Sequence, residues 1–594
     1  MNPMKPFQKR IFWLVAVVST LLLIPFLGET LFYSKGEPRE AIVAYSMLES
    51  GNWILPLNYG TDIAYKPPFL YWCIAAVSWV AGGVSEFTSR LPSALAFLAM
   101  ELVFFVFVTK RKTCVEALLA SVLLFTSFEV HRAAVACRLD MMQVSLIVIS
   151  ICLLFQWDEA GRRRLPWLAI VLMACASLTK GPVGSIFPCL VVGALQVMRG
   201  QSFKRTFAQH TVIGLLSLVP LGLWFWAAYK QGGQAFADLM LEENTGRFFS
   251  TMSYASHENP LWYNFLTLIW GWLPWTLVLV LALFEVPWRE LYLLLWDERL
   301  RLRLRVAWRK FRRQPPERLL AWLAIVLIFV FYCIPKSKRS VYLLPIYPFM
   351  ARLLAEYLLV QSVFRARFIR VSAAIFATLG MLVTGFFIAL RLKLVPEFTW
   401  SSGPFAFEDL LITDALRLTP LTPLDWLLAL LPAVAAVLTF QVLTSKGQSV
   451  SLLSGTMGCI LCLFVAFDGV YQPLVLSAKS DRYLAERVEK YVPEGPVYSF
   501  TTTNFYSVNY YLGDRMRHIV KERPEGKGWL LVPEKNEQAM REAIGQDYRL
   551  EKVFHTMGRS CDQRCPVIFY KFERKRPDAP AAPGPVSTPN PAKP

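Results

Sequence analysis

The run Ile11–Gly28, IFWLVAVVSTLLLIPFLG, contains 18 residues and no charged side chain. A helix of about 20 apolar residues spans the hydrocarbon core of a bilayer. The run Ala321–Ile334 has the same character, and neither run alternates apolar and polar residues as the strands of an outer-membrane barrel do. These stretches predict a polytopic α-helical membrane protein.

The composition of the whole chain agrees with this prediction. Of the 594 residues, 55% are hydrophobic and 18% are charged, whereas soluble chains average about 45–50% and about 25%. This excludes a disordered protein and disfavours a cytosolic enzyme. The formal net charge of +19 comes largely from basic clusters in short loops between apolar runs, as the positive-inside rule describes. We expect membrane lipids, and no nucleic acid, as partners of these loops; phosphate ligands are the other alternative.

Thirteen apolar runs are expected to cross the membrane. They lie near residues 11–28, 91–108, 114–131, 141–157, 165–179, 183–198, 211–229, 261–285, 319–334, 341–360, 371–391, 423–443 and 450–470. With this count every basic cluster falls on the cytoplasmic side, including the strongest one, Arg289–Arg318. Counting Pro67–Gly83 as a further span would break the agreement, so we interpret it as a juxtamembrane or re-entrant helix on the outer face.

The organisation along the chain follows from these runs. Residues 1–471 form the predicted transmembrane domain, whose first outer loop, 29–90, carries juxtamembrane helices. Residues 472–575 alternate strand-like and helix-like segments and predict a small α/β domain outside the cytoplasm. Residues 576–594 are a proline-rich tail expected to be disordered. Cys561 and Cys565 would lie in an oxidising compartment, where a short-loop disulfide is an open alternative.

Acids and bases gather at the outer ends of these spans. Glu37 and Asp140 are the carboxylates. The cations that the positive-inside rule would not place on the outer side are Lys66, Lys180, Lys338 and Arg339. A carboxylate can take a proton from an acceptor hydroxyl or amine, and cations can hold a phosphate and stabilise it as a leaving group. A proton-coupled transporter would carry similar groups.

A set of motifs in fixed order narrows this choice. The order is GEPREA, GNWILPLNYG, YKPPFLYW, SRLPSAL, RLDM, LTKGPVG, EENTGRF and KSKRSVYLLPIYP, from residue 36 to about residue 348. It resembles the GT-C glycosyltransferases, in particular the lipid A 4-amino-4-deoxy-L-arabinose transferases and the protein mannosyltransferase group.

The resemblance implies an inverting transferase in the bacterial inner membrane, with its C-terminal domain in the periplasm. Its donor would be a sugar on a polyprenyl (undecaprenyl) phosphate, and its acceptor lipid A or another glycan. A protein acceptor is the alternative within the family. A flippase or transporter of lipid-linked sugars is the alternative from a different class.

The resemblance also assigns roles to single residues. The family's Asp-Glu-x-Arg motif reads Gly36-Glu37-Pro38-Arg39 here, so the leading acid is missing. Glu37 is then the expected catalytic base, and Asp140 is the other candidate. The expected phosphate-binding residues are Arg39, Lys66, Lys180, Lys338 and Arg339, and the expected substrate-binding residues are Tyr65, Glu243, Arg247 and Tyr342. Tyr65 replaces a family acid associated with metal binding, so no metal site is assigned and a divalent metal stays open.

Overall fold

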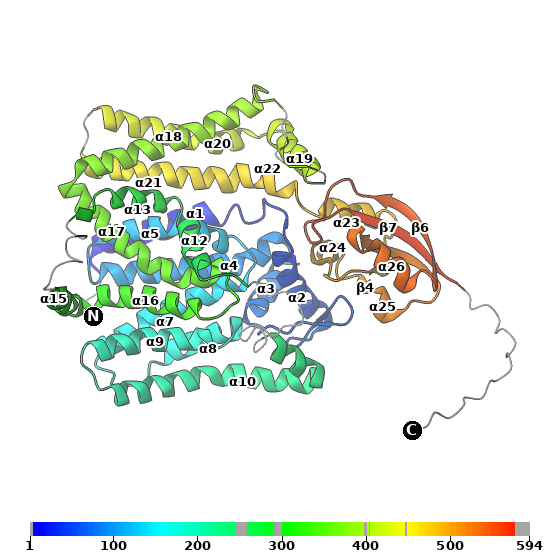
Figure 1. The fold of residues 1–594 in the computed structure, drawn as a ribbon, viewed down its shortest axis with the longest axis horizontal. Helices are drawn as coiled ribbons and strands as arrows, with labels where there is room; N and C mark the ends of the chain where they lie inside the picture. Colours follow the sequence, from blue (N-terminus) through cyan, green and yellow to red (C-terminus); the bar gives the residue numbers. More distant parts are fainter. Residues whose placement is uncertain are drawn as a thin grey trace.

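The computed structural model describes residues 4–243, 258–289, 292, 300–396, 399, 401–402, 404–445 and 448–575. Most of its long helices run side by side, and a small sheet domain lies at one end of them (Figure 1). Arg247 and the proline-rich tail, 576–594, lie outside the described residues.

Nine helices of the described part are long and apolar enough to cross a membrane, and the chain is a multi-pass membrane protein. They are α1 (Pro6–Leu23), α4 (Glu86–Thr109), α7 (Leu139–Glu159), α10 (Phe203–Leu241), α16 (Pro316–Cys333), η2 with α17 (Ser340–Ile346 and Tyr347–Phe364), α18 (Ala366–Arg391), α20 (Pro423–Thr444), and α21 with η3 and α22 (Ser449–Ala466, Phe467–Tyr471 and Gln472–Ser477). The helical membrane fold predicted from the sequence is therefore confirmed.

Two further spans are broken helices. The pair α5 (Cys114–Phe125) and α6 (Phe128–Ala134) bends by 73°, and the pair α12 (Trp262–Gly271) and α13 (Trp275–Leu283) bends by 112°. Counting each pair once gives up to eleven spans in the described residues. The predicted number of thirteen is not confirmed, because α8 (Trp167–Lys180) and α9 (Val183–Met198) have 14 and 16 residues. At 1.5 Å per residue they fall short of a hydrocarbon core about 30 Å thick.

The centre of the helical part is formed by α4 and α7. α7 is buried over 78% of its apolar window, whereas the corresponding share of α20 is 22%. This contrast places α20 at the periphery, where it packs with α18 and α21, while α8, α9 and α10 pack along the opposite side (Figure 1). Phe97, Phe105 and Phe155 are among the largest fully buried side chains of the central layer.

Two short helices follow α1 at the end of the bundle that faces the sheet domain. α2 (Gly36–Ser50) ends at Gly51, whose φ of 67° lies in the left-handed region that glycine favours. α3 (Phe69–Ala81) has 13 residues, too few to span, which agrees with the sequence interpretation of Pro67–Gly83 as a juxtamembrane segment. Between them lies a small hairpin, β1 (Leu57–Asn58) and β2 (Asp62–Ile63). We call this end of the bundle the outer end.

The C-terminal domain contains a five-stranded sheet of order β4-β3-β5-β7-β6. Its strands are β3 (Val497–Ser499), β4 (Met516–His518), β5 (Lys527–Pro533), β6 (Tyr548–His555) and β7 (Val567–Arg574). β3 pairs in parallel with β4 and β5, and β7 pairs antiparallel with β5 and β6. The accompanying helices are α23 (Arg482–Glu489), α24 (Tyr506–Tyr511), α25 (Ile519–Glu522), η4 (Glu534–Asn536) and α26 (Glu537–Ile544).

The first outer loop is anchored in this domain by Tyr59. Its ring is 1% exposed and lies in the domain core, where its hydroxyl is 2.6 Å from the Ser499 hydroxyl. Its backbone N–H donates to Asp514 over 2.8 Å. Burying an aromatic ring of this size contributes about 1.5–3 kcal/mol, so the loop and the domain form one unit at the outer end.

Cys561 and Cys565 are both free thiols in the structure. The disulfide considered from their spacing is therefore not formed. The Cys561 sulfur instead lies 3.2 Å from a carboxylate oxygen of Asp481, which precedes α23.

The arrangement predicts how the chain sits across the membrane. The N-terminus and the basic helix α15 (Leu300–Arg312) lie at the end of the bundle opposite the sheet domain (Figure 1). Cysteines introduced at the exposed positions Leu57 and Val520 should both react with an impermeant maleimide added outside spheroplasts, and one at Arg305 should react only after lysis. The wild-type chain supplies the background. Labelling of only one of the two outer positions would contradict the shared face.

Candidate functional site: a cation-lined cavity at the outer end

A cavity of about 480 Å³ opens at the outer end, between the bundle and the C-terminal domain. Eight separate segments of the described chain contribute to its wall, so it exists only in the folded molecule. Its lining residues are Ser34, Lys35, Gly36, Arg39, Glu40, Tyr65, Lys66, Pro67, Arg132, Arg138, Leu139, Asp140, Lys180, Met240, Glu243, Tyr263, Lys338, Arg339, Ser340, Val341, Cys561 and Arg564.

The wall of this cavity is strongly positive. Among the described residues it contains nine lysines and arginines but only three carboxylates, Glu40, Asp140 and Glu243. Like charges gathered in a partly water-excluded space repel one another, and a bound anion relieves that repulsion. The cavity is therefore suited to an anionic ligand such as a phosphate, which arginine and lysine bind through charge-assisted hydrogen bonds.

Glu40 holds two of these cations in place. Its carboxylate accepts hydrogen bonds from Arg39, at 2.8 Å, from Lys66 and from the Tyr71 hydroxyl. Burial alone would raise the pKa of Glu40, but the charges of Lys66 and Arg39 outweigh it and hold that pKa well below the usual range. The carboxylate is consequently ionised and fixes both cations at the cavity wall.

Lys66 has an unusual protonation equilibrium as a result. Burial lowers the pKa of Lys66, and the neighbouring charge of Arg39 lowers it further; Glu40 opposes both, and the resulting pKa is about 7. The positive charge of Lys66 therefore depends on pH near neutrality.

Asp140 and Lys180 form the second ion pair of the wall. Asp140 lies in the first turn of α7 and Lys180 in the last turn of α8, and their side chains are in direct contact. The Lys180 ammonium also lies 4.9 Å from the centre of the Tyr342 ring, a cation–π contact. Tyr342 itself stacks on Tyr332 and is not among the lining residues, so it supports Lys180 from behind.

Lys338 and Arg339 reach the cavity from the loop before η2. The Lys338 ammonium donates to the carbonyls of Pro335, at 2.7 Å, and Asn259, at 3.1 Å. These contacts use two of its three donors and tie the loop to the segment before α12. Tyr65 and Glu243 also line the cavity.

Glu37 is placed differently from the other predicted site residues. It is 3% exposed and does not line the cavity. Its two oxygens accept hydrogen bonds from Arg90 over 2.8 and 3.1 Å, and one of them also accepts the Cys137 N–H over 2.9 Å. Burial raises the pKa of Glu37, but the Arg90 charge and hydrogen bond outweigh it, and the net pKa lies below the usual value. The carboxylate thus ties α2 to α4 and lies against a smaller cavity of about 40 Å³, which Tyr33 and Arg132 also line.

Gly36 leaves room for Arg138 at the place of the family's missing acid. A Cβ atom at position 36 would lie 2.7 Å from an Arg138 guanidinium nitrogen. The guanidinium therefore approaches the backbone of α2 closely at Gly36. Asp140, two residues after Arg138, is the carboxylate that lines the described part of the cavity beside this guanidinium.

Five charged lining residues had no assigned role from the sequence: Lys35, Glu40, Arg132, Arg138 and Arg564. The signal for Arg132 and Arg138 was their place in the same outer loop as Asp140. Glu40 stands three positions after Glu37, and the sequence alone could not separate the two. Arg564 gave no signal, because its loop reaches the cavity only through the docking of the C-terminal domain.

Comparisons with known proteins agree with this geometry. Residues 65–224, which include Lys66, Asp140 and Lys180, match the family described as dolichyl-phosphate-mannose-protein mannosyltransferase. The solved structure of ArnT from Cupriavidus metallidurans bound to undecaprenyl phosphate superimposes with a TM-score of 0.66 at 18% identity, covering 94% of this chain and 97% of that one. At this identity the likeness establishes the shared fold.

The chain is a glycosyltransferase of the GT-C type.

Relatives of this glycosyltransferase have been named in several bacteria. It is 27% identical over 359 residues to the undecaprenyl phosphate-alpha-4-amino-4-deoxy-L-arabinose arabinosyl transferase 2 of Proteus mirabilis, a match that covers 58% of each chain. It is 26% identical over 422 residues to an uncharacterized protein of Aquifex aeolicus, covering 67% of this chain and 76% of that one. The glycosyltransferase thus spans less than two thirds of the length of the Proteus enzyme.

The position of Glu37 in this glycosyltransferase predicts a structural role. Glu37→Ala leaves Arg90 buried without its partner, which costs about 3–5 kcal/mol of stability for a buried pair. We expect a clearly lower melting temperature in detergent, with Glu49→Ala, an exposed acid of the same helix, as the matched control. Unchanged stability together with lost turnover would instead return Glu37 to the chemistry.

Proposed function

We propose that this glycosyltransferase moves a sugar from a polyprenyl phosphate, such as undecaprenyl phosphate, to lipid A or another glycan at the periplasmic face of the bacterial inner membrane. The names of its relatives in Proteus mirabilis and the ligand of the Cupriavidus structure support the donor class. The observation that carries the proposal is the cavity with nine cationic residues at the outer end of the bundle.

The donor phosphate fits the cationic wall. Arg39, Lys66 and Lys180 face the cavity from three different segments, and Lys338 and Arg339 close it from a fourth. Together they would surround a phosphate whose polyprenyl tail extends sideways into the bilayer. Because the phosphate gains charge as it leaves the sugar, these cations stabilise the transition state more than the ground state.

Asp140 is the proposed catalytic base. Its carboxylate would accept the proton of the acceptor hydroxyl while the hydroxyl oxygen forms a bond to the anomeric carbon. The bond between that carbon and the phosphate oxygen breaks, and its electron pair leaves with the lipid phosphate, so the configuration inverts. General-base catalysis of this kind contributes about 10²–10⁴-fold.

Lys180 would couple donor binding to this base. In the structure its ammonium is engaged by Asp140, which leaves the carboxylate little basicity. The negatively charged phosphodiester of the donor, placed beside Lys180, competes for that ammonium, and the Tyr342 ring behind it supports the charge in either position. Asp140 would thus become available for a proton only when donor is present, which limits wasteful hydrolysis of the donor.

Asp140→Asn tests the base. The variant keeps the size of the side chain and removes its ability to take a proton, so turnover should fall by about 10²–10⁴-fold while donor binding changes little. The measurement is release of free polyprenyl phosphate from purified protein, donor and candidate acceptors in detergent. Near-normal release by Asp140→Asn would remove this carboxylate from the mechanism. No release by the wild type with any acceptor, but donor movement in vesicles, would favour a transporter.

Lys66 makes a second test, because its charge changes near neutral pH. Losing a charge-assisted contact of about 1.5–3 kcal/mol should weaken donor binding by Lys66→Ala about 10- to 100-fold. In the wild type, the fraction of charged Lys66 falls as pH rises through the pKa of about 7, so donor affinity should decline between about pH 6 and about pH 8.5. Lys66→Arg stays charged throughout and should lose this decline.

Lys527→Ala, an exposed lysine of the C-terminal domain paired with Glu573, is the control for both Lys66 variants. Equal affinity of Lys66→Ala and wild type at about pH 6 would contradict a phosphate contact at Lys66.

A further inference from the structure

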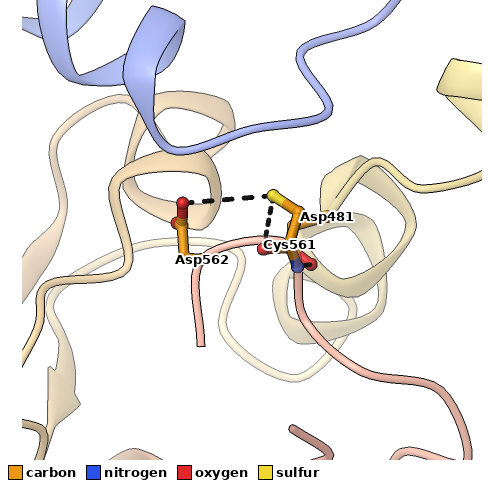
Figure 2. A group of neighbouring side chains, drawn as sticks. All are labelled: Asp481, Cys561 and Asp562. Carbon is orange, nitrogen blue, oxygen red and sulfur yellow. Dashed lines mark hydrogen bonds between the residues drawn. The ribbon is translucent and has the colours of Figure 1, made fainter. Parts of the chain in front are cut away.

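A compact group of three potential metal ligands lies in the C-terminal domain, behind the cavity wall. Asp481 precedes α23, and Cys561 and Asp562 lie in the loop between β6 and β7. Figure 2 shows the Cys561 sulfur between the two carboxylates. Their ligand atoms all lie within 4.8 Å of one another, and among the described residues this is the only such group of His, Cys, Asp and Glu side chains.

The hydrogen bonds that the two carboxylates accept come from the surrounding loops, and the three side chains face one another at the centre of the group. Asp481 accepts hydrogen bonds at its rim from the Ser560 hydroxyl, at 2.7 Å, and from the Cys561 N–H, at 3.1 Å. One oxygen of Asp562 accepts the Ser507 N–H at 2.7 Å. The other points at the Cys561 sulfur, which is 4.0 Å away (Figure 2). That distance is too long for more than a weak interaction, so a buried carboxylate oxygen faces the group without a strong partner.

The group is also short of positive charge. Asp481 and Asp562 are 4% and 5% exposed, and in the described part of the chain no Lys, Arg or His nitrogen lies within 4 Å of either carboxylate. Buried carboxylates are normally paired or coordinate a metal, and here a cation at the centre would provide the compensation.

We propose that Asp481, Cys561 and Asp562 bind one divalent transition-metal ion, with Zn²⁺ the best match to the donor set. One thiolate and two carboxylate oxygens suit zinc, at about 2.3 Å for sulfur and about 2.0–2.2 Å for oxygen. Tetrahedral geometry with these bonds separates ligand atoms by roughly 3.3–3.6 Å. The Cys561 sulfur lies 3.2 Å from Asp481 and 4.0 Å from Asp562, so small side-chain shifts close the site. The thiol proton is released on binding, and a water completes the coordination.

The metal would fasten the β6–β7 loop to the start of α23. That loop carries Arg564 into the cation-lined cavity and Arg559 to Glu408 on α19 (Pro404–Leu418). Cys561 lines both the cation-lined cavity and a neighbouring one of about 530 Å³. The ion would therefore fix the wall shared by the two cavities, independently of which sugar or acceptor the enzyme uses.

Cobalt binding tests the proposal without any activity measurement. The full-length protein in detergent is stripped with a chelator and titrated with Co²⁺, whose bond to a thiolate gives a near-ultraviolet charge-transfer band. We expect one equivalent to bind with this band, and Zn²⁺ to displace it. Cys565→Ser is the matched control, since this thiol lies four residues away outside the group, and it should behave as the wild type.

Cys561→Ser should lose the charge-transfer band, and Asp562→Asn should keep the thiol but bind Co²⁺ more than about 100-fold more weakly, because even outer-sphere partners of metal ligands are worth about 10–100-fold. Zn²⁺ should raise the melting temperature of the wild type and of Cys565→Ser, but not of Asp562→Asn. No band in the wild type, or an unchanged band in Cys561→Ser, would overturn the proposal. Should Cys561→Ser not fold, equal Co²⁺ affinity of Asp562→Asn and wild type would overturn it equally.

Discussion

The buried ion pair between Glu37 and Arg90 is the interaction on which the outer end depends. Arg90, near the start of α4, donates to both Glu37 oxygens and also to the carbonyls of Leu27, at 2.8 Å, and Thr30, at 2.6 Å. Glu37 in turn accepts the N–H of Cys137. One guanidinium and one carboxylate thus join the end of α1, the start of α2, α4 and the entry to α7. Each charge is satisfied in full, which is the condition under which a buried pair is tolerated.

This junction positions the residues that line the cavity. Arg39 and Glu40 follow Glu37 on α2, and Asp140 follows Cys137 at the start of α7, so one ion pair sets the distance between the two walls of the cavity. The walls then use the opposite principle. They hold more cations than carboxylates, and that excess of positive charge is relieved only by an anion. Charges are thus compensated at the junction, whereas the cavity wall keeps an excess of positive charge that suits an anion.

The C-terminal domain completes the cavity rather than merely covering it. Tyr59 inserts into its core, and Asp62 of the same outer loop accepts hydrogen bonds from Lys521, at 2.8 Å, and Asn504. Through this docking, Arg564 joins a wall otherwise built from membrane helices and their loops. The cavity therefore gains one of its cations from a sheet domain, more than 200 residues after Val341 in the chain.

The sequence alone determined the properties that depend on composition and local pattern. Long apolar runs predicted the membrane helices, and the alternation of strand-like and helix-like segments predicted the sheet and helices after residue 472. Cations on the unfavoured side pointed to the outer end, and eight of the residues named from the sequence line the cavity there: Arg39, Tyr65, Lys66, Asp140, Lys180, Glu243, Lys338 and Arg339.

What tertiary structure decided was which charges meet. Glu37 and Glu40 lie one helical turn apart, yet Arg90 on α4 claims the first and Lys66 the second. The number of spans depended on helix lengths and bends, and the state of Cys561 depended on Asp481, eighty residues away in sequence. Partners brought together by folding leave no periodic signal in a single sequence, because their spacing along the chain is set by the path between them and not by the contact itself.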